Sequence, residues 1–156
     1  GWATPGSASG YVLPMQYFRD QGMVTAQNEP VFFGSLVQTG SHDNGLVSVV
    51  QGTIDATTSW YYSPKSGAHT RAAGAGTIKL EDIRFIHESA PVPNAPFVVT
   101  KDHPEPMKRA MQQCIVNMNW SDPAAYDKVA KDVFGGFAVA SHEDYIEFIK
   151  IRLATK

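Results

Sequence analysis

The sequence has few of the residues on which several common functions depend. It contains one cysteine among 156 residues, which excludes an intrachain disulfide and a multi-cysteine zinc site. Its 13 lysines and arginines are balanced by 15 acidic residues, and no basic stripe marks it as a partner of nucleic acid. No apolar run approaches the roughly 20 residues of a membrane span. What is present, 43% hydrophobic and 18% charged residues, is typical of one globular domain or of two small lobes.

The chain opens abruptly on Gly1-Trp2-Ala3, and no signal peptide precedes these residues. They are more typical of the end of a strand than of a natural N-terminus. We therefore expect a mature or truncated product.

Apolar spacing and capping residues predict helices and strands in alternation along the chain. The predicted helices cover 11–22, 41–52, 66–73, 102–118, 121–135 and 141–156. The predicted strands cover 31–33, 53–60, 83–89 and 97–100. The predicted helix caps are Ser41, Asp102 with Glu105 in a capping box, Asp122, and Ser141 with Asp144. This alternation is typical of an α/β fold with a mainly parallel sheet.

The stretch TPGSASGYVLP, residues 4–14, joins small hydroxyl residues to an apolar segment. It is not a nucleophile elbow, because Ala8 stands where the G-x-S-x-G pattern needs its serine. It is not a Walker loop, because no lysine follows Gly10. Ser7 or Ser9 is expected to cap a helix that begins near Gly10, whose free N–H groups and dipole favour an anion. The alternative is an ordinary capped helix without a ligand.

His42 is the most informative of the five histidines, because it takes the first position of the predicted helix 41–52. Open α/β sheets place ligands beside helix N-termini at the carboxyl ends of strands. Two helix starts, one near Gly10 and one at His42, would then converge on one small anion. The alternative is a plain surface histidine. The other histidines lack the spacing of metal ligands, so we expect neither a metal nor another cofactor.

Two further features have both a structural and a functional interpretation. Trp60, Tyr61 and Tyr62 follow a predicted strand, where they either line a pocket or pack beneath the Gly/Ala-rich segment. Cys114 lies on the apolar stripe of the predicted helix 102–118, where core packing is a better interpretation than thiolate chemistry. Because no nucleophile is spaced with a base, and no carboxylates are paired, we do not expect an enzyme.

The order of three motifs adds information that none of them carries alone. The elements SASGYVLP, GSHDNGLVSVVQGTIDA and SAPVPNAPFVVTKDHPEPMK follow one another along the chain. This order resembles the phosphonate-binding proteins of ABC importers, in which S-T-S-G-Y-x-x-P, an S-H element ending in V-D-A, and P-x-P-N-D-P occur in turn. The resemblance covers essentially the whole sequence.

The resemblance implies a periplasmic-binding-protein fold of type II and a phosphonate-type oxyanion held at the S-T-S helix start. Ser7, Ala8 and Ser9 stand at the S-T-S positions, Gly10 follows, and His42 stands at the family histidine. Tyr61 and Asn94 complete the candidate ligand-binding residues. Ala8 replaces the middle threonine, so that one hydroxyl is lost while the backbone N–H is kept.

Two other departures from the family pattern concern charge. Ala95 replaces the acidic residue of the P-x-P-N-D-P element, and Trp60 with Tyr61 stands where some members place a carboxylate. Those carboxylates suit the ammonium group of an aminophosphonate. We therefore expect a ligand without an amine, such as methylphosphonate, phosphite or phosphate.

The family also implies how the chain is divided. Residues 1–96 would form one complete α/β lobe, the second of two, and 97–156 would add a crossover strand and helices that belong with a missing first lobe. The implied function is the substrate-binding component of an ABC importer, located in the periplasm or anchored there as a lipoprotein. Its partners would be a small oxyanion, an ABC permease, and the missing N-terminal lobe or a complementary fragment. The alternative is an oxyanion-sensing module of a signalling system with the same fold.

Overall fold

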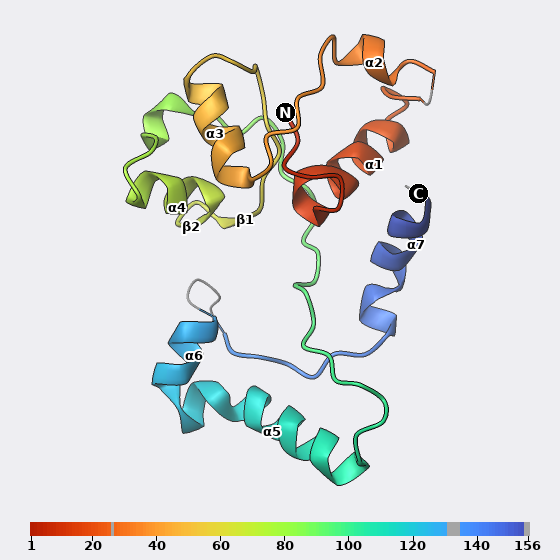
Figure 1. Cartoon of the computed structure of the whole chain (residues 1–156), viewed down its shortest axis with the longest axis vertical. Coiled ribbons are helices and arrows are strands. Elements are labelled where there is room, and N and C mark those ends of the chain that lie inside the picture. Colours follow the sequence, from red (N-terminus) through yellow and green to blue (C-terminus); the bar gives the residue numbers. More distant parts are fainter. Residues whose placement is uncertain (26, 131–134, 155–156) are drawn as a thin grey trace. The chain divides into compact units, whose positions relative to one another are not determined.

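The computed structural model describes residues 1–25, 27–130 and 135–154, which divide into two compact units (Figure 1). The first unit comprises Gly1–Ala90 together with Phe148–Lys156, and the second comprises Pro91–Glu147. Helices dominate both units, and the sheet is small. This mixture is compatible with part of an α/β lobe.

The first unit begins with two consecutive helical segments. The π-helix η1 (Ala8–Val12) leads into α1 (Leu13–Asp20), which ends where Gly22 adopts a φ of +67°. An aromatic-rich core cluster forms around these two segments. Its buried members are Trp2, Met15 and Val24, and Tyr11, Phe18 and Phe33 pack against them. The predicted apolar face of helix 11–22 is therefore confirmed.

The second half of the first unit is built on two short helices. α3 (His42–Val50) begins at the predicted cap Ser41, and α4 (Ala68–Gly74) lies within one or two residues of its predicted bounds. The two helices share a core made of Leu46, Ala68, Ala72 and Ile78. On α3, Leu46 is buried, while Val50, the last residue of the helix, is exposed.

The predicted mainly parallel sheet does not form among the described residues. The sheet they contain pairs β1 (Tyr61–Ser63) with β2 (Ser66–Gly67) in antiparallel orientation, and an isolated bridge joins Trp2 to Gln38 in parallel. The segments 53–60, 83–89 and 97–100, predicted as strands, are not strands in the structure. A strand needs a neighbouring backbone to satisfy its hydrogen bonds. These segments have suitable side chains, but no ladder forms along them in the described ranges.

The predicted strand 31–33 is also wrong, because the chain forms the short helix α2 (Glu29–Phe32) there. The N–H of Asn28 donates to the Thr25 hydroxyl at 3.2 Å, which closes a turn just before this helix. Pro30 lies in its first turn, where a missing N–H costs nothing. After α4, the 3₁₀ helix η2 (Leu80–Asp82) is the last regular element before the second unit.

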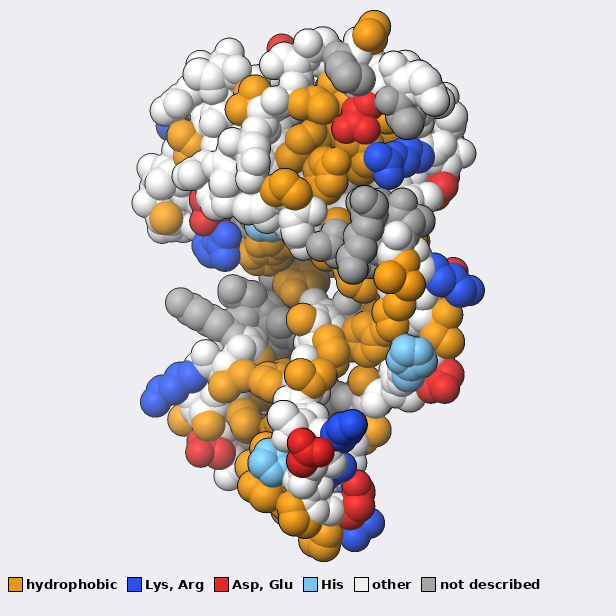
Figure 2. All heavy atoms as spheres, turned by 45° about the vertical axis from the view of Figure 1, so that its right-hand side comes forward, with side chains coloured by type: hydrophobic (Ala, Val, Ile, Leu, Met, Phe, Trp, Pro, Cys, Tyr) orange, Lys and Arg blue, Asp and Glu red, His pale blue; other side chains and the backbone are white. Residues whose placement is uncertain are grey.

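The second unit has almost no core of its own. It contains α5 (Glu105–Ser121), α6 (Pro123–Val129) and the 3₁₀ helix η3 (Glu143–Tyr145), and α7 (Ile146–Ala154) begins at its end. Ala130 is the one buried hydrophobic residue among its described residues. Apolar side chains instead lie at the surface, as the space-filling view shows (Figure 2).

Of the predictions for the second unit, the Asp122 cap is confirmed and the others are wrong in whole or in part. Pro104, not Asp102, precedes the first residue of α5, so the predicted capping box is absent. Cys114 is exposed rather than packed in a core, because no residue of α5 is buried. Asp122 caps α6 through the Ala125 N–H at 2.9 Å. The Asp144 carboxylate accepts from the Ser141 N–H at 2.7 Å, but His142 is the N-cap of η3 and no side chain caps it, so Ser141 is not the predicted cap.

Two predicted helix ends reach beyond what the structure describes. α6 ends at Val129, and 131–134, within the predicted helix 121–135, lie outside the described residues. The last two residues of the predicted helix 141–156 also lie outside them.

Candidate anion-binding site

Ser7 is the residue that caps the first helical segment. Its hydroxyl oxygen accepts from the Gly10 N–H at 3.0 Å, and its carbonyl accepts from the N–H groups of Tyr11 and Val12, each at 3.0 Å. This contact decides between the two predicted capping serines in favour of Ser7. The first N–H groups of a helix have no partner within it, so those of Ala8 and Ser9 are suited to an external acceptor.

The start of α3 is held by a small network that orients His42. The Ser41 hydroxyl accepts from the Asn44 N–H at 3.1 Å, which caps the helix. Thr39 donates its hydroxyl to the Ser41 carbonyl at 3.0 Å, and Asn44 donates its side-chain amide to the Thr39 carbonyl at 3.1 Å. These contacts fix the first turn of α3, of which His42 is the first residue.

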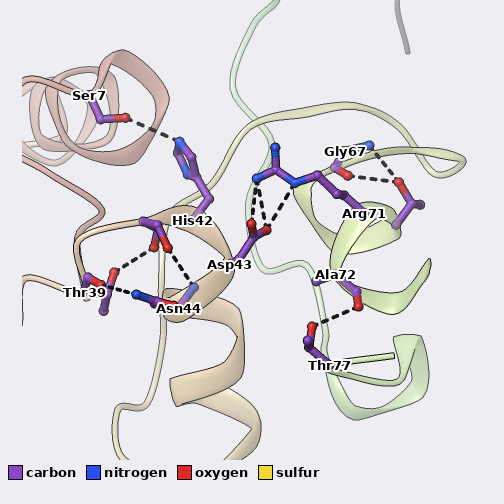
Figure 3. A network of polar contacts seen from close by, with 11 residues as sticks. Ser7, Thr39, His42, Asp43, Asn44, Gly67, Arg71, Ala72 and Thr77 are labelled. Carbon is purple, nitrogen blue, oxygen red and sulfur yellow. Dashed lines mark hydrogen bonds and ion pairs between the residues drawn. The ribbon is translucent and has the colours of Figure 1, made fainter. Parts of the chain in front are cut away.

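The structure brings the two helix starts together. The Nε2 atom of His42 lies 3.5 Å from the Ser7 hydroxyl oxygen, a long contact that joins residues 35 positions apart (Figure 3). Gly10 makes this approach possible. A β-carbon on Gly10 would lie 2.6 Å from the Ala3 Cβ, 2.7 Å from the Ser7 Oγ and 3.0 Å from the His42 Cε1. Because real β-carbons essentially never come within 3.0 Å of other atoms, a side chain at position 10 would force Ala3 or Ser7 to move and would crowd His42.

Thr58 is a member of this cluster that the sequence analysis did not single out. Its hydroxyl donates to the Gly10 carbonyl at 2.8 Å, across 48 residues of chain. The bond ties the turn at Gly10 to the segment that follows α3. A threonine in a Thr/Ser-rich stretch carries no sequence signal for this role, because the partner is a distant backbone carbonyl.

The polar atoms of His42 determine what the ring can donate. Its Nδ1 atom is buried and makes no hydrogen bond of normal geometry within the described ranges, although the Thr58 main chain lies near the ring. The Nε2 atom faces the Ser7 oxygen, and which of the two donates depends on the tautomer of the ring. When Nε2 carries the ring proton, the hydrogen of the Ser7 hydroxyl is free to point at an external oxyanion.

Burial keeps this ring neutral. Burial is the largest influence on the His42 imidazole and lowers its pKa below the ordinary value of 6.5. The Thr58 main chain acts in the opposite direction, as does the Asp43 carboxylate, while the Arg71 cation lowers the pKa further. At neutral pH the site therefore presents neutral donors rather than an imidazolium.

The structure does not place Tyr61 and Asn94 with this cluster. Tyr61 stacks on the buried His69 ring at 5.6 Å between centroids, and Phe85 contacts both rings. Burial, with the Glu88 carboxylate, raises the pKa of the Tyr61 phenol, so its hydroxyl stays a donor. Asn94 belongs to the second unit, is exposed, and its carbonyl accepts from the Tyr145 hydroxyl at 2.9 Å.

The cluster has only part of the arrangement of a catalytic site. A serine beside a histidine has the composition of a nucleophile and its base, but a working pair needs a third group to orient the base. The Nδ1 atom of His42 has no such partner, and the Ser7 oxygen already accepts from Gly10. Among the described residues, no group of three or more histidine, cysteine, aspartate or glutamate side chains is arranged to hold a metal.

Comparison with known families gives the class of protein. A family model described as an ABC transporter, phosphonate, periplasmic substrate-binding protein matches residues 2–145. The chain therefore belongs to the family of phosphonate periplasmic substrate-binding proteins of ABC transporters. No curated protein and no solved structure matches it.

Family membership has plain consequences for function. The family is one of substrate-binding components of transporters and not an enzyme class, and it implies a small ligand and an ABC permease as partners. The family works outside the cytoplasm. Within the described ranges, no helix combines the length and hydrophobicity needed to cross a lipid bilayer.

Proposed function

We propose that this chain binds a phosphonate, phosphite or phosphate-like oxyanion at the start of η1, for import by an ABC transporter. The observation that supports the proposal most is the contact between Ser7 and His42, which converge from two separate helix starts over Gly10. An ordinary capped helix does not need a second helix start against its cap. The site is composed of donors, as an oxyanion requires.

The ligand-binding residues of the proposal each have a distinct role. The Ser7 hydroxyl, oriented by His42, and the Ser9 hydroxyl donate to the anion. The backbone N–H groups from Ala8 to Gly10 add donors at the positive end of the helix. Tyr61 and Asn94 are proposed to approach the substituent on the phosphorus atom when the ligand is bound.

The two-lobed architecture of the family is part of the same proposal. Residues 1–96 act as the second lobe, a complete α/β lobe that carries the anion site, and 97–156 pack on a first lobe supplied by a preceding or complementary chain segment. The small core of the second unit supports this division, because its apolar residues find little cover in the described chain. The location would be periplasmic, free or lipoprotein-anchored.

Calorimetric titration with methylphosphonate, phosphite and phosphate tests the proposal. We expect at least one of these anions to bind, with Ser9→Ala weakening it by roughly ten- to a hundredfold, since each charge-assisted hydrogen bond contributes about 1.5–3 kcal/mol. Ser7→Ala removes both a donor and the helix cap. Unchanged affinity in both variants would place the anion elsewhere, and no binding by any of the three anions would refute the proposal.

A further inference from the structure

Arg71 of α4 makes a forked contact with Asp43 of α3. Its Nη2 atom donates to both carboxylate oxygens of Asp43 at 3.0 Å, and its Nε donates to Oδ1 at 3.3 Å (Figure 3). A planar guanidinium that holds a carboxylate through several N–H groups fixes orientation as well as distance. This geometry distinguishes the pair from an ordinary contact between flexible charged side chains.

An aromatic ring also contacts the guanidinium. The guanidinium carbon of Arg71 lies 5.3 Å from the centroid of the Trp60 ring, within the range of a cation–π contact. Trp60 itself packs against the core shared by α3 and α4. The guanidinium therefore contacts both a carboxylate and an aromatic ring, even though the Arg71 side chain is 52% exposed.

The carboxylate that Arg71 holds belongs to the residue after His42. In the first turn of α3, the His42 ring is directed at Ser7 while the Asp43 carboxylate is directed at Arg71 (Figure 3). The contact between His42 and Ser7 is long, at 3.5 Å, so a small rotation of this turn would break it. The fork is a polar contact between this turn and α4, next to the core that the two helices share.

We propose that Arg71 is a positioning residue of the anion site: its fork on Asp43 sets the first turn of α3 so that His42 stays against Ser7. This inference rests on the proposed function of that site. Its role is to hold this turn in place, because its guanidinium already binds the Asp43 carboxylate rather than a ligand. If the guanidinium instead attracted the anion by its charge, the negative charge of Asp43 would weaken anion binding. In that case, Asp43→Asn would tighten it.

Opposite substitutions in the pair separate these two roles. We would titrate methylphosphonate into Arg71→Gln, Arg71→Lys, Asp43→Asn and the exchanged double variant Asp43→Arg/Arg71→Asp. Arg19→Gln is the matched control, because Arg19 forms a 3.5 Å ion pair with Glu29 elsewhere in the same unit. The His42 ring signals of each variant would be followed by NMR in the absence of ligand.

A positioning role predicts that Arg71→Gln and Asp43→Asn both weaken anion binding. We expect a loss of about fivefold in affinity, because an ion pair as exposed as this one contributes only a small free energy. Arg71→Lys should weaken it too, because lysine keeps the charge and loses the fork, while the exchanged variant recovers part of the loss. Tighter binding by Asp43→Asn, or affinity equal to that of Arg19→Gln in all variants, would overturn the proposal.

The NMR measurement keeps this inference separate from the proposed function. We expect Arg71→Lys and Asp43→Asn to move the His42 Nε2 signal in the same direction as Ser7→Ala does, because each breaks the contact between His42 and Ser7. If the wild-type protein bound none of the anions, the proposed function would fail, and this signal alone would decide the placement of His42. An Nε2 signal unchanged in both variants would show that the fork does not position the ring.

Discussion

The Cε1 atom of His42 lies 3.0 Å from the point that a β-carbon on Gly10 would occupy. The same point is 2.6 Å from the Ala3 Cβ, and neither neighbour is the flexible end of a long side chain. Gly10 has an ordinary φ, so the glycine is required by the close approach of its neighbours and not by backbone conformation.

Gly10→Ala is therefore expected to lower the free energy of unfolding by about 1–3 kcal/mol, the usual cost of overpacking. Urea denaturation measures this loss. Gly6→Ala is the matched control, because nothing lies within 4 Å of its would-be β-carbon. The alanine at position 10 should also displace His42 and abolish anion binding. Equal stability of the two variants would show that Ala3, Ser7 and His42 can move to accommodate a β-carbon at position 10 at little cost in free energy.

Stability should fall in mild acid because of His42. The pKa of His42 in the folded chain lies below the ordinary value of 6.5. Just below pH 6.5, the ring therefore binds a proton in the unfolded chain but not in the folded chain. The contribution of the neutral His42 ring to the free energy of unfolding is fully present above pH 6.5. It is lost as the pH falls through the folded-state pKa of this ring. Urea unfolding measured from about pH 7 to about pH 5 should show a shallower decline for His42→Gln than for wild type.

The same substitution at the exposed His142 controls for the loss of one histidine elsewhere in the chain. Parallel pH profiles for wild type and His42→Gln would mean that the ring takes up its proton equally well in both states.

The ligand is expected to lack an amine. A buried ammonium needs acceptors, and an unpaired buried charge is costly. At the two places where the family pattern can supply carboxylates, this chain has Ala95 and the pair Trp60-Tyr61. In paired calorimetric titrations, methylphosphonate should bind more tightly than aminoethylphosphonate. A preference of about tenfold for the amine, roughly 1.4 kcal/mol, would contradict this expectation.

The exposed apolar residues of α5 are expected to cause association. Met107 is 46% exposed and Trp120 is 83% exposed, on a helix that buries none of its residues. We expect the isolated chain to self-associate or to bind a complementary N-terminal segment. In sedimentation velocity, Met107→Gln combined with Met111→Gln should shift the distribution toward the 17.0 kDa monomer. A compact wild-type monomer at all concentrations would contradict the prediction.

Local chemistry made some features predictable from the sequence. The caps Ser41 and Asp122 each bind an N–H three residues further on, so their evidence lies within one turn of chain. The same holds for Ser7, although the sequence could not choose between it and Ser9. Ser7 and Ser41 cap the two helix starts from which the candidate site is built.

Features that depend on distant partners were not predictable. The segments 53–60, 83–89 and 97–100 have strand-like side chains, but a strand exists only where another backbone pairs with it. Cys114 shows the same limit for helices, because periodicity identifies an apolar face without showing that anything covers it. The roles of Thr58 and Arg71 likewise depend on partners 48 and 28 residues away.

The hydrogen bond from Thr58 to Gly10 also orders events in time. Helical turns form within about a microsecond, so the turn capped by Ser7 can form before distant parts of the chain meet. The bond from Thr58 to the Gly10 carbonyl closes a loop across 48 residues, so it forms only once the intervening chain has folded back. The serine turn is thus local and fast, whereas the contact that ties it down waits for the rest of the unit.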